Sequence, residues 1–400
     1  MAEKGKIQNT FHRSARFTVG LLAATLVFEL LLYAIEISPL WRVLPVAEVA
    51  LYGPDSETGY TIRPNVSGVW VAENRARIQM SAQGLRDSDT PFEKPKGLWR
   101  IALAGDSITE ALQVEESKTF ANLLESHLSK KGREVEVINL GISGALPSVQ
   151  VARMESVGVR FSPDLLVYMI NISDFASPTL RTDSAFPGYR RDVSGEWRLS
   201  YAFRDTRGYH LRQSFIGQTL YWLLDHSRVM RIINARLNQG FGISDKKDDS
   251  AEVPSPPSCG VTVAGAVATA LRQPNNAPEV RGAMDGFLRD VAVTAKRVGV
   301  PAVLAVRGLP QSCKGERETN RRLQADLEAH LRDFGIGMLD MDAVVIMAMN
   351  KAAMGDDINV LYGFGTRVGF GHLNHKGHDI YSRALADGLA PWINGLSEGM

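Results

Sequence analysis

From residue 99 onward, short apolar runs alternate with longer segments of helical periodicity. Five runs have the length and continuous apolar character of buried strands: 99–104, 135–138, 164–170, 301–306 and 336–340. Apolar residues recur three and four positions apart at 281–297, 316–334 and 376–389, as in helices with one buried face. Strands alternating with helices are typical of a parallel sheet covered on both faces. The pattern predicts a three-layer α/β/α fold, in which sites form where strands end.

The N-terminal pattern is different, a single long apolar run at 17–35. About 20 apolar residues can cross a bilayer as a helix. Basic residues precede the run, so the N-terminus is expected in the cytoplasm and the rest of the chain outside it: Lys4, Lys6, Arg13 and Arg16. The run is longer than a usual signal-peptide core, and no clear cleavage site follows it. An uncleaved anchor is therefore favoured over a cleaved signal peptide, and the flanking charges argue against a buried core helix.

Glu29 is the one charged residue within this run. A carboxylate at mid-bilayer costs about 3 kcal/mol on insertion scales. Because Glu29 lies in the outer half, its side chain either reaches toward the interface or contacts another membrane helix, a possible membrane partner.

The patterns divide the chain into segments: a cytoplasmic tail (1–16), a transmembrane anchor (17–36), an extracytoplasmic lead-in (37–98) and an α/β domain (99–392) with an insertion (175–281). We expect the lead-in to form short strands and turns at the domain edge, and we assign it no chemistry. In the insertion, 213–237 has helical spacing and predicts a packed helix. The arginines and aromatic residues before it suit either an anionic glycan or lipid headgroup, or a small aromatic core.

Composition narrows the function classes. The net charge is +1, with 22% charged and 44% hydrophobic residues. A nucleic-acid-binding protein would carry a strong basic bias, so no nucleic-acid partner is expected.

Gly105-Asp106-Ser107 is the first candidate for chemistry, because it follows the run 99–104 directly and a helical pattern follows it. A serine at such a junction lies beside free N–H groups that can stabilise an oxyanion, which suits a nucleophile. The alternative is that Ser107 only caps the next helix.

Three further blocks follow in order. Residues 139–144 read Asn-Leu-Gly-Ile-Ser-Gly, 171–174 read Asn-Ile-Ser-Asp, and 371–378 read Gly-His-Leu-Asn-His-Lys-Gly-His. Together with Gly105-Asp106-Ser107, these blocks and their strand-end positions resemble the SGNH (GDSL-type) hydrolase family over roughly residues 97–392. The resemblance implies an SGNH-hydrolase-like, flavodoxin-like fold.

The resemblance also implies site roles. Ser107 would be the nucleophile, and its backbone N–H part of the oxyanion hole. Gly141 would donate a second N–H, and Ser173 or Asn171 would stand where the family has an asparagine donor. His372 would be the general base.

The acid expected three residues before this histidine is missing, because Gly369 stands there. A triad acid fixes the tautomer of histidine and stabilises the imidazolium. Three explanations stay open: a backbone carbonyl orients His372, a carboxylate from elsewhere substitutes, or the site has decayed to a binding function. Candidate carboxylates are Asp356, Asp357 and Asp174. Asp174 and Asp106 are each possible either as the acid or as structural residues.

Other residues with chemical potential are given structural interpretations. His375 and His378 follow His372 at the start of a helix, but no carboxylate or cysteine cluster joins them, so neither a metal nor another cofactor is expected. Cys259 and Cys313 are the two cysteines. Outside the cytoplasm they are candidates for a disulfide.

The sequence thus predicts a membrane-anchored, periplasmic or otherwise extracytoplasmic serine esterase that forms an acyl-Ser107 intermediate. Its expected substrates are O-acyl, above all O-acetyl, groups of envelope glycans, with lipid esters as a further class. The alternatives are an O-acetyltransferase acting on a polysaccharide, which would use the same residues, and a degenerate glycan-binding or assembly protein.

Overall fold

The five predicted strands form one parallel sheet. In a computed structural model of the chain they are β5 (Trp99–Ala104), β6 (Val135–Asn139), β7 (Leu165–Asn171), β10 (Ala302–Arg307) and β11 (Gly337–Asp340), in the order β11-β10-β7-β5-β6. All four pairings are parallel. The structure describes residues 2–44, 48–129, 134–171, 174, 185–240, 277–308, 325 and 327–395.

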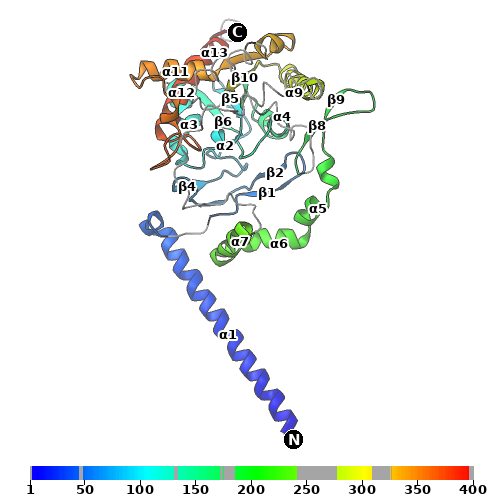
Figure 1. The fold of residues 1–400 in the computed structure, drawn as a ribbon, viewed down its shortest axis with the longest axis vertical. Helices are drawn as coiled ribbons and strands as arrows, with labels where there is room; N and C mark the ends of the chain where they lie inside the picture. The colour runs from blue at the N-terminus through cyan, green and yellow to red at the C-terminus, as the bar shows by residue number, and fades with distance from the viewer. Residues whose placement is uncertain are drawn as a thin grey trace.

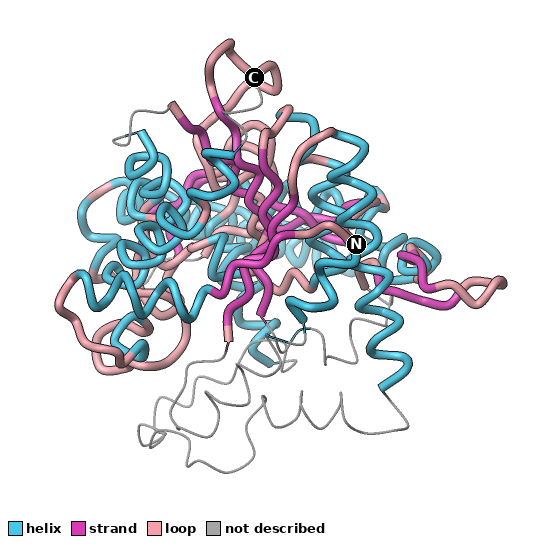
Figure 2. The backbone as a smooth tube through the Cα atoms, turned by 90° about the horizontal axis from the view of Figure 1, so that it is seen from above, coloured by secondary structure: helices cyan, strands magenta, loops and turns pink. Residues whose placement is uncertain are grey.

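Helices cover both faces of the sheet, as Figure 2 shows. Every residue of β5, β7 and β10 is buried, and successive side chains enter opposite layers. Ile101 and Leu103 pack in the layer of α3 (Phe120–Ser129), α11 (Met341–Lys351) and α12 (His375–Gly388). Ala102 and Ala104 pack in the layer of α4 (Pro147–Ser156) and α9 (Ala277–Val298). The predicted three-layer α/β/α fold is therefore confirmed.

The lead-in forms two antiparallel hairpins, β1 (Tyr52–Asp55) with β2 (Gly59–Ile62) and β3 (Ser67–Trp70) with β4 (Ala76–Gln79). A small core joins them to the segment after β6 through buried residues of both parts, including Ile62, Ile78 and Ile142. The shorter elements are η1 (Pro39–Arg42), η2 (Glu116–Lys118), η3 (Gly158–Phe161), η6 (Ala202–Asp205), η7 (Ile358–Leu361) and α13 (Ala390–Gly395).

The N-terminus is one long helix, α1 (Ala2–Ile37), which projects away from the domain (Figure 1). Its segment Ser14–Ile37 is long and apolar enough to span a membrane, with 6% of its most apolar window buried. A signal sequence would pass the same test of length and composition.

The described part of the insertion contains the hairpin β8 (Gly188–Arg191) and β9 (Trp197–Ser200), followed by helices α5 (Arg207–Gln213), α6 (Phe215–His226) and α7 (Arg228–Gly240). Tyr189 and Phe203 are buried, as expected for a small aromatic core. The prediction of a single packed helix at 213–237 is wrong on two points. The segment is two helices, because Ser227 interrupts the pattern, and many of its apolar side chains are exposed.

Glu125 of α3 makes the free energy of unfolding depend on pH. Glu125 accepts the Val137 N–H at 2.7 Å. Its pKa is raised to about 8, by burial first and also by the nearby charge of Asp87. In the unfolded chain this carboxyl has its ordinary pKa of 4.5. Only the folded state therefore keeps the proton between pH 4.5 and about 8. Stability contributed by protonated Glu125 is therefore present at low pH and lost as pH rises through about 8.

Glu125→Gln is therefore expected to raise Tm at pH 9 and to leave it nearly unchanged at pH 4. The gain should be several degrees, since about 1 kcal/mol shifts Tm by about 2–4 °C in a domain of this size. Thermal unfolding at both pH values measures it. Glu134→Gln is the matched control, because it changes an exposed carboxylate that lines the same surface cavity as Glu125. An equal shift in Tm at both pH values would contradict the assignment.

Candidate active site

Ser107 lies at the carboxyl end of β5, as the first residue of α2 (Ser107–Glu110). The preceding residue, Asp106, is the N-cap, and its carboxylate accepts the Ile108 N–H at 2.9 Å. The capping function that could have explained Ser107 therefore belongs to Asp106. The other carboxylate oxygen of Asp106 pairs with Arg307 on β10, which fixes the turn to the sheet. The hydroxyl of Ser107 is left for another use.

His372 supplies a partner for that hydroxyl. It lies in the loop between η7 and α12, and its Nε2 is 2.8 Å from Ser107 Oγ. The loop is held by backbone hydrogen bonds at the histidine and two residues after it. Gly363 N–H donates to the His372 carbonyl at 2.8 Å, and Asn374 N–H donates to the Leu361 carbonyl at 2.9 Å. Residues 265 positions apart in the chain are thus brought into hydrogen-bond contact.

The other ring nitrogen of His372 contacts Glu73, in the turn between β3 and β4. His372 Nδ1 lies 2.8 Å from Glu73 Oε1, and the His372 backbone N–H donates to Glu73 Oε2 at 2.9 Å. Both carboxylate oxygens therefore hold the same residue. Burial raises the pKa of the Glu73 carboxyl, but the two hydrogen bonds from His372 outweigh it and lower the pKa overall, so Glu73 is ionised at neutral pH.

The turn that carries Glu73 is fixed in place. Glu73 has φ +63°, a left-handed conformation that costs a non-glycine residue about 1–2 kcal/mol. Strain of this kind persists where surrounding contacts over-determine the backbone. The Asn74 side chain donates to the Gln113 carbonyl at 2.7 Å, beyond α2, and Arg75 donates to the Trp41 carbonyl at 2.6 Å. These contacts place the carboxylate beside the loop of His372.

Ser107, His372 and Glu73 thus form a continuous hydrogen-bonded chain of nucleophile, base and acid types. Residues 103–380 match the GDSL-like Lipase/Acylhydrolase family. The chain belongs to this family. The resemblance inferred from the sequence motifs is confirmed, and the protein is an SGNH-type ester hydrolase.

Several solved structures are similar to this GDSL-like hydrolase. They include the psychrotrophic esterase EstA from Pseudoalteromonas sp. (10% identity, 74% of this chain, 98% of that chain, TM-score 0.35). Another is a catalytic mutant of Axe2, an acetylxylan esterase from Geobacillus stearothermophilus (14% identity, 73% of this chain, 94% of that chain, TM-score 0.35). A third is TesA (14% identity, 73% of this chain, 99% of that chain, TM-score 0.35). No curated protein matches the chain.

The carboxylate on His372 in this GDSL-like hydrolase is not one of those singled out from the sequence. Asp357 caps η7 by accepting the Asn359 N–H at 3.1 Å, and Asp356 is exposed on the same loop. Asp174 accepts the Asn171 N–H at 3.2 Å. Burial raises its pKa to about 7, and the charge of Asp106 acts in the same direction.

Of the three explanations for the missing acid, the structure shows a carboxylate from elsewhere. The assignment of no chemistry to the lead-in is wrong, because Glu73 belongs to it. Nothing in the local sequence around Glu73 distinguishes it from other polar turns. The one signal in the sequence was Gly371, next to His372. A glycine has no side chain, so another group can approach the backbone closely there.

The block at 139–144 contributes backbone N–H groups near α2. Gly141 packs so closely that a Cβ would lie 2.4 Å from the Glu110 nitrogen, and its own N–H donates to Asn139 Oδ1 at 3.0 Å. It is therefore engaged in this conformation, and its assignment as an oxyanion donor requires Asn139 to release it. The exposed Gly144 has an N–H for which no partner is found among the described residues.

Glu110 fixes this block to α2. It is fully buried, accepts the Ser143 N–H at 2.7 Å, and receives the Tyr52 hydroxyl at 2.7 Å. The Ser143 hydroxyl also donates to it. Burial raises the pKa of Glu110. The three donors satisfy its oxygens, so the turn that precedes Gly144 is held rigidly against the helix of Ser107.

The remaining site predictions have different outcomes. Asn171 is buried at the end of β7, in register with Arg307, while Ser173, Cys259 and Cys313 lie outside the described residues. His378 is a core residue: its Nδ1 accepts the Phe120 N–H at 3.2 Å, and burial lowers its pKa to about 3. Within the described ranges, no group of three or more His, Cys, Asp or Glu side chains could hold a metal ion.

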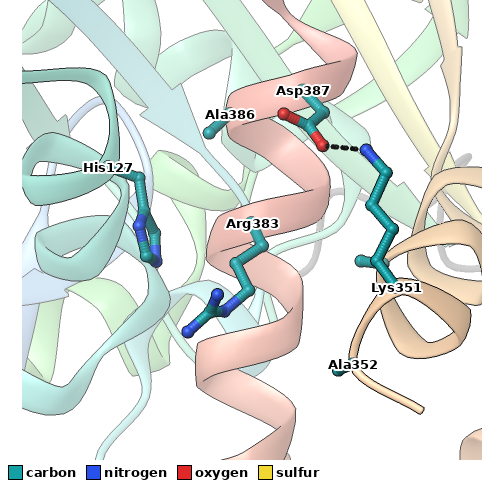
Figure 3. Close-up of a pocket in the computed structure, with 7 residues that line it drawn as sticks. His127, Lys351, Ala352, Arg383, Ala386 and Asp387 are labelled. Atoms are coloured by element: carbon teal, nitrogen blue, oxygen red, sulfur yellow. Dashed lines mark hydrogen bonds and ion pairs between the residues drawn. The ribbon is translucent and has the colours of Figure 1, made fainter. Parts of the chain in front are cut away.

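A cavity of about 340 Å³ lies elsewhere, between α3, α11 and α12 (Figure 3). It is lined by His127, Arg383 and the Lys351–Asp387 ion pair of 2.7 Å, among others. None of Ser107, His372 and Glu73 lines it, so it is separate from the candidate active site.

Gly371 allows the close approach of acid and base, and gives a sharp test of this geometry. A Cβ at Gly371 would lie 2.5 Å from Glu73 Oε2, so Gly371→Ala is expected to push the carboxylate away from His372. We expect kcat to fall about 10–100-fold, in line with the cost of misplacing catalytic groups by about 1 Å. Steady-state kinetics on a chromogenic acetyl ester measures the effect.

Gly369→Ala is the matched control. Gly369 also has a positive φ, +94° against +83° for Gly371, but its Cβ would meet nothing closer than Asn359 at 3.7 Å. The two variants share the backbone penalty and differ in contact with Glu73. Equal losses of kcat in both would contradict the assignment.

Proposed function

We propose that this hydrolase cleaves esters through an acyl-Ser107 intermediate, with His372 as general base and acid and Glu73 as the residue that orients His372. The observation that carries the proposal is the continuous chain of contacts, 2.8 Å from Ser107 Oγ to His372 Nε2 and 2.8 Å from His372 Nδ1 to Glu73. These are the distances expected of a working nucleophile and base.

In acylation, Ser107 Oγ attacks the carbonyl carbon of the ester while its proton passes to His372 Nε2. The C–O bond to the leaving alcohol then breaks, and His372 returns the proton to that oxygen. In deacylation, water takes the place of the serine hydroxyl. It gives its proton to His372, attacks the acyl carbon and releases the acid, with the proton returned to Ser107. Glu73 stays ionised throughout and stabilises the imidazolium.

The oxyanion of each tetrahedral intermediate needs N–H donors. Ser107 is the first residue of α2, so its N–H has no partner within the helix, and we assign it as one donor. The Gly144 N–H is the second, because Gly141 donates to Asn139 and Ser143 donates to Glu110. Asn171 at the end of β7 is a further candidate for this hole.

The proposed substrates are acyl, above all acetyl, esters of envelope glycans. The side chains of His372 and Glu73 keep 25% and 27% of their surface exposed. A surface site of this kind suits a substituent on a polymer better than a long acyl chain that needs a deep apolar tunnel. The Axe2 structure is described as an acetylxylan esterase, and we extend this substrate class to the present chain as part of the proposal.

The experiment uses the full chain purified in detergent. A chromogenic acetyl ester and an O-acetylated polysaccharide are supplied, and released acetate is measured with and without an alkylphosphonate ester that traps serine nucleophiles. We expect both substrates to be cleaved, and mass spectrometry to place the phosphonate on Ser107. A label elsewhere would refute the nucleophile, and cleavage of the chromogenic ester alone would refute the glycan substrate.

We also propose that α1 is an uncleaved anchor and that the domain lies outside the cytoplasm. The basic residues before Ser14–Ile37 and the apolar exposed surface of this segment support it. Alkaline phosphatase fused to the C-terminus should be active. A fluorescent protein that folds only in the cytoplasm, fused at the same position, should give no fluorescence. The reverse pair of results would contradict this topology.

A further inference from the structure

Helices α6 and α7 carry large apolar side chains that are exposed. Six large ones are between 44% and 85% exposed: Phe215, Ile216, Leu220, Trp222, Ile233 and Leu237. They come from two consecutive helices that lie on the side of the domain facing α1 (Figure 1). A grouping of exposed apolar residues of this size marks an interaction surface.

The start of α7 is fixed to α1. Glu29 accepts the N–H groups of Arg228 and Val229 at 2.6 and 3.1 Å. The Ser227 hydroxyl donates to the same carboxylate at 3.0 Å. Glu36, further along α1, pairs with Arg228. The lone charge of the apolar segment therefore has its partners within this chain. The sequence left open a position near the interface or contact with another membrane helix. The observed partner is α7 of the same chain, which is not long and apolar enough to span a membrane.

The position of Glu29 along α1 fixes the depth of this contact. Any 20-residue stretch within Ser14–Ile37 ends between residues 33 and 37, which is four to eight residues beyond Glu29. At about 1.5 Å per residue, Glu29 lies about 6–12 Å below the outer end of such a stretch. If α1 spans the bilayer, the first turn of α7 must lie at or below the level where the lipid chains begin.

Composition agrees with this depth. Residues 207–240 contain five arginines and one aspartate, and no lysine or glutamate. Arg207 of α5 and Arg236 of α7 are exposed. Exposed Trp, Phe and Leu together with arginine are typical of helices that lie in the plane of a membrane surface and attract anionic headgroups.

The opposite side of α6 is attached to the domain. Leu224 is buried, Asp225 pairs with Arg63 next to β2, and the Arg63 guanidinium lies 5.2 Å from the centre of the Tyr221 ring. One side of α6 thus contacts the lead-in through Arg63. Phe215 and Trp222 are not part of this contact and have 85% and 57% of their surface exposed.

We infer that α6 and α7 lie in the outer surface of the bilayer that α1 crosses, with their apolar side chains among the acyl chains and Arg236 of α7 at anionic headgroups. This inference rests on the anchor given under Proposed function. It makes the membrane contact of the protein a surface of three helices, and it fixes the domain in one orientation above the lipid.

Quenching of Trp222 by brominated lipid tests the inference on the full chain. Nanodiscs that each hold one copy are prepared from phosphatidylethanolamine and phosphatidylglycerol, with or without bromine on the acyl chains. Wild type, Trp222→Phe and Trp197→Phe are compared. Trp197 is the matched control because it packs against Gly282 of α9, within the domain. Fractional quenching should be slightly higher in Trp197→Phe than in wild type, because an unquenched tryptophan is removed, and at least about 2-fold lower in Trp222→Phe.

The outcomes separate the inference from the anchor. Flotation with vesicles after washing at pH 11 first shows whether α1 holds the protein in lipid, and loss from the vesicles would refute the anchor and this inference together. If the protein floats but Trp222→Phe and wild type are quenched to the same fraction, the anchor stands and the inference is overturned. A disc with one copy of the protein contains no second molecule that could cover the apolar side chains of α6 and α7. If a second copy is their natural partner, Trp222 will therefore be unquenched in these discs, which also overturns the inference.

Discussion

Replacing Ser107 with alanine is expected to lower kcat for ester hydrolysis by about 10⁴–10⁶-fold, the range seen when a serine nucleophile is removed. Without Oγ, no acyl-enzyme forms, and only binding and the oxyanion donors remain. The fold should be retained, because the Ser107 side chain has its hydrogen bond with His372 and the turn is held by Asp106. Steady-state kinetics on an acetyl ester, with circular dichroism for the fold, measures both.

The histidines provide the matched control for this result. His372→Ala should cost nearly as much as Ser107→Ala, and the double variant little more, because nucleophile and base act as a unit. His375→Ala changes an exposed histidine three residues further on and should leave kcat within about 3-fold, as for surface changes outside the reacting atoms. Wild-type turnover in Ser107→Ala would refute the mechanism.

Glu73→Gln is expected to lower kcat by about 10²–10⁴-fold, by analogy with the loss when a triad acid becomes an amide. Glutamine keeps the size of the side chain but not the charge that stabilises the imidazolium. It also presents an NH₂ group that favours the wrong tautomer of His372. KM should change little, because Glu73 touches the base and not the substrate.

Glu57→Gln is the control for the lead-in. Glu57 lies in the β1–β2 turn and pairs with Arg204 at 3.0 Å, so it has the same residue type in the same segment without contact with His372. Its kcat should match that of the wild type. If Glu73→Gln behaves as Glu57→Gln does, then Glu73 is a structural residue and the site works as a dyad.

Much of the fold could be predicted from the sequence because local pattern and tertiary environment agree. The run Trp99–Ala104 is continuously apolar, and β5 is buried at every position with side chains in both helix layers. Ser107 and His372 were identifiable because each lies in a block whose order along the chain is informative. Ser107 lies where β5 ends, and the loop between η7 and α12 brings His372 to within 2.8 Å of it.

Glu73 could not be predicted, because its role depends on a contact across 299 positions and on a turn with no periodicity. The exposure of α6 was missed for another reason. Helical spacing of apolar residues shows that a helix has an apolar face, but not whether that face meets protein or lipid. Glu29 was recognised as unusual from its place in the run, yet its partner Arg228 is 199 positions away.

The position of Glu73 in the lead-in also has a practical meaning for anyone trimming this protein. The region that matches the family starts at residue 103, and a truncation that removes the lead-in would keep both the serine and the histidine. Such a fragment would carry a recognisable hydrolase sequence and have no triad acid. A soluble version should therefore begin before Trp41, whose carbonyl holds the hairpin through Arg75. Inactivity of a shorter fragment would say nothing about the activity of the whole chain.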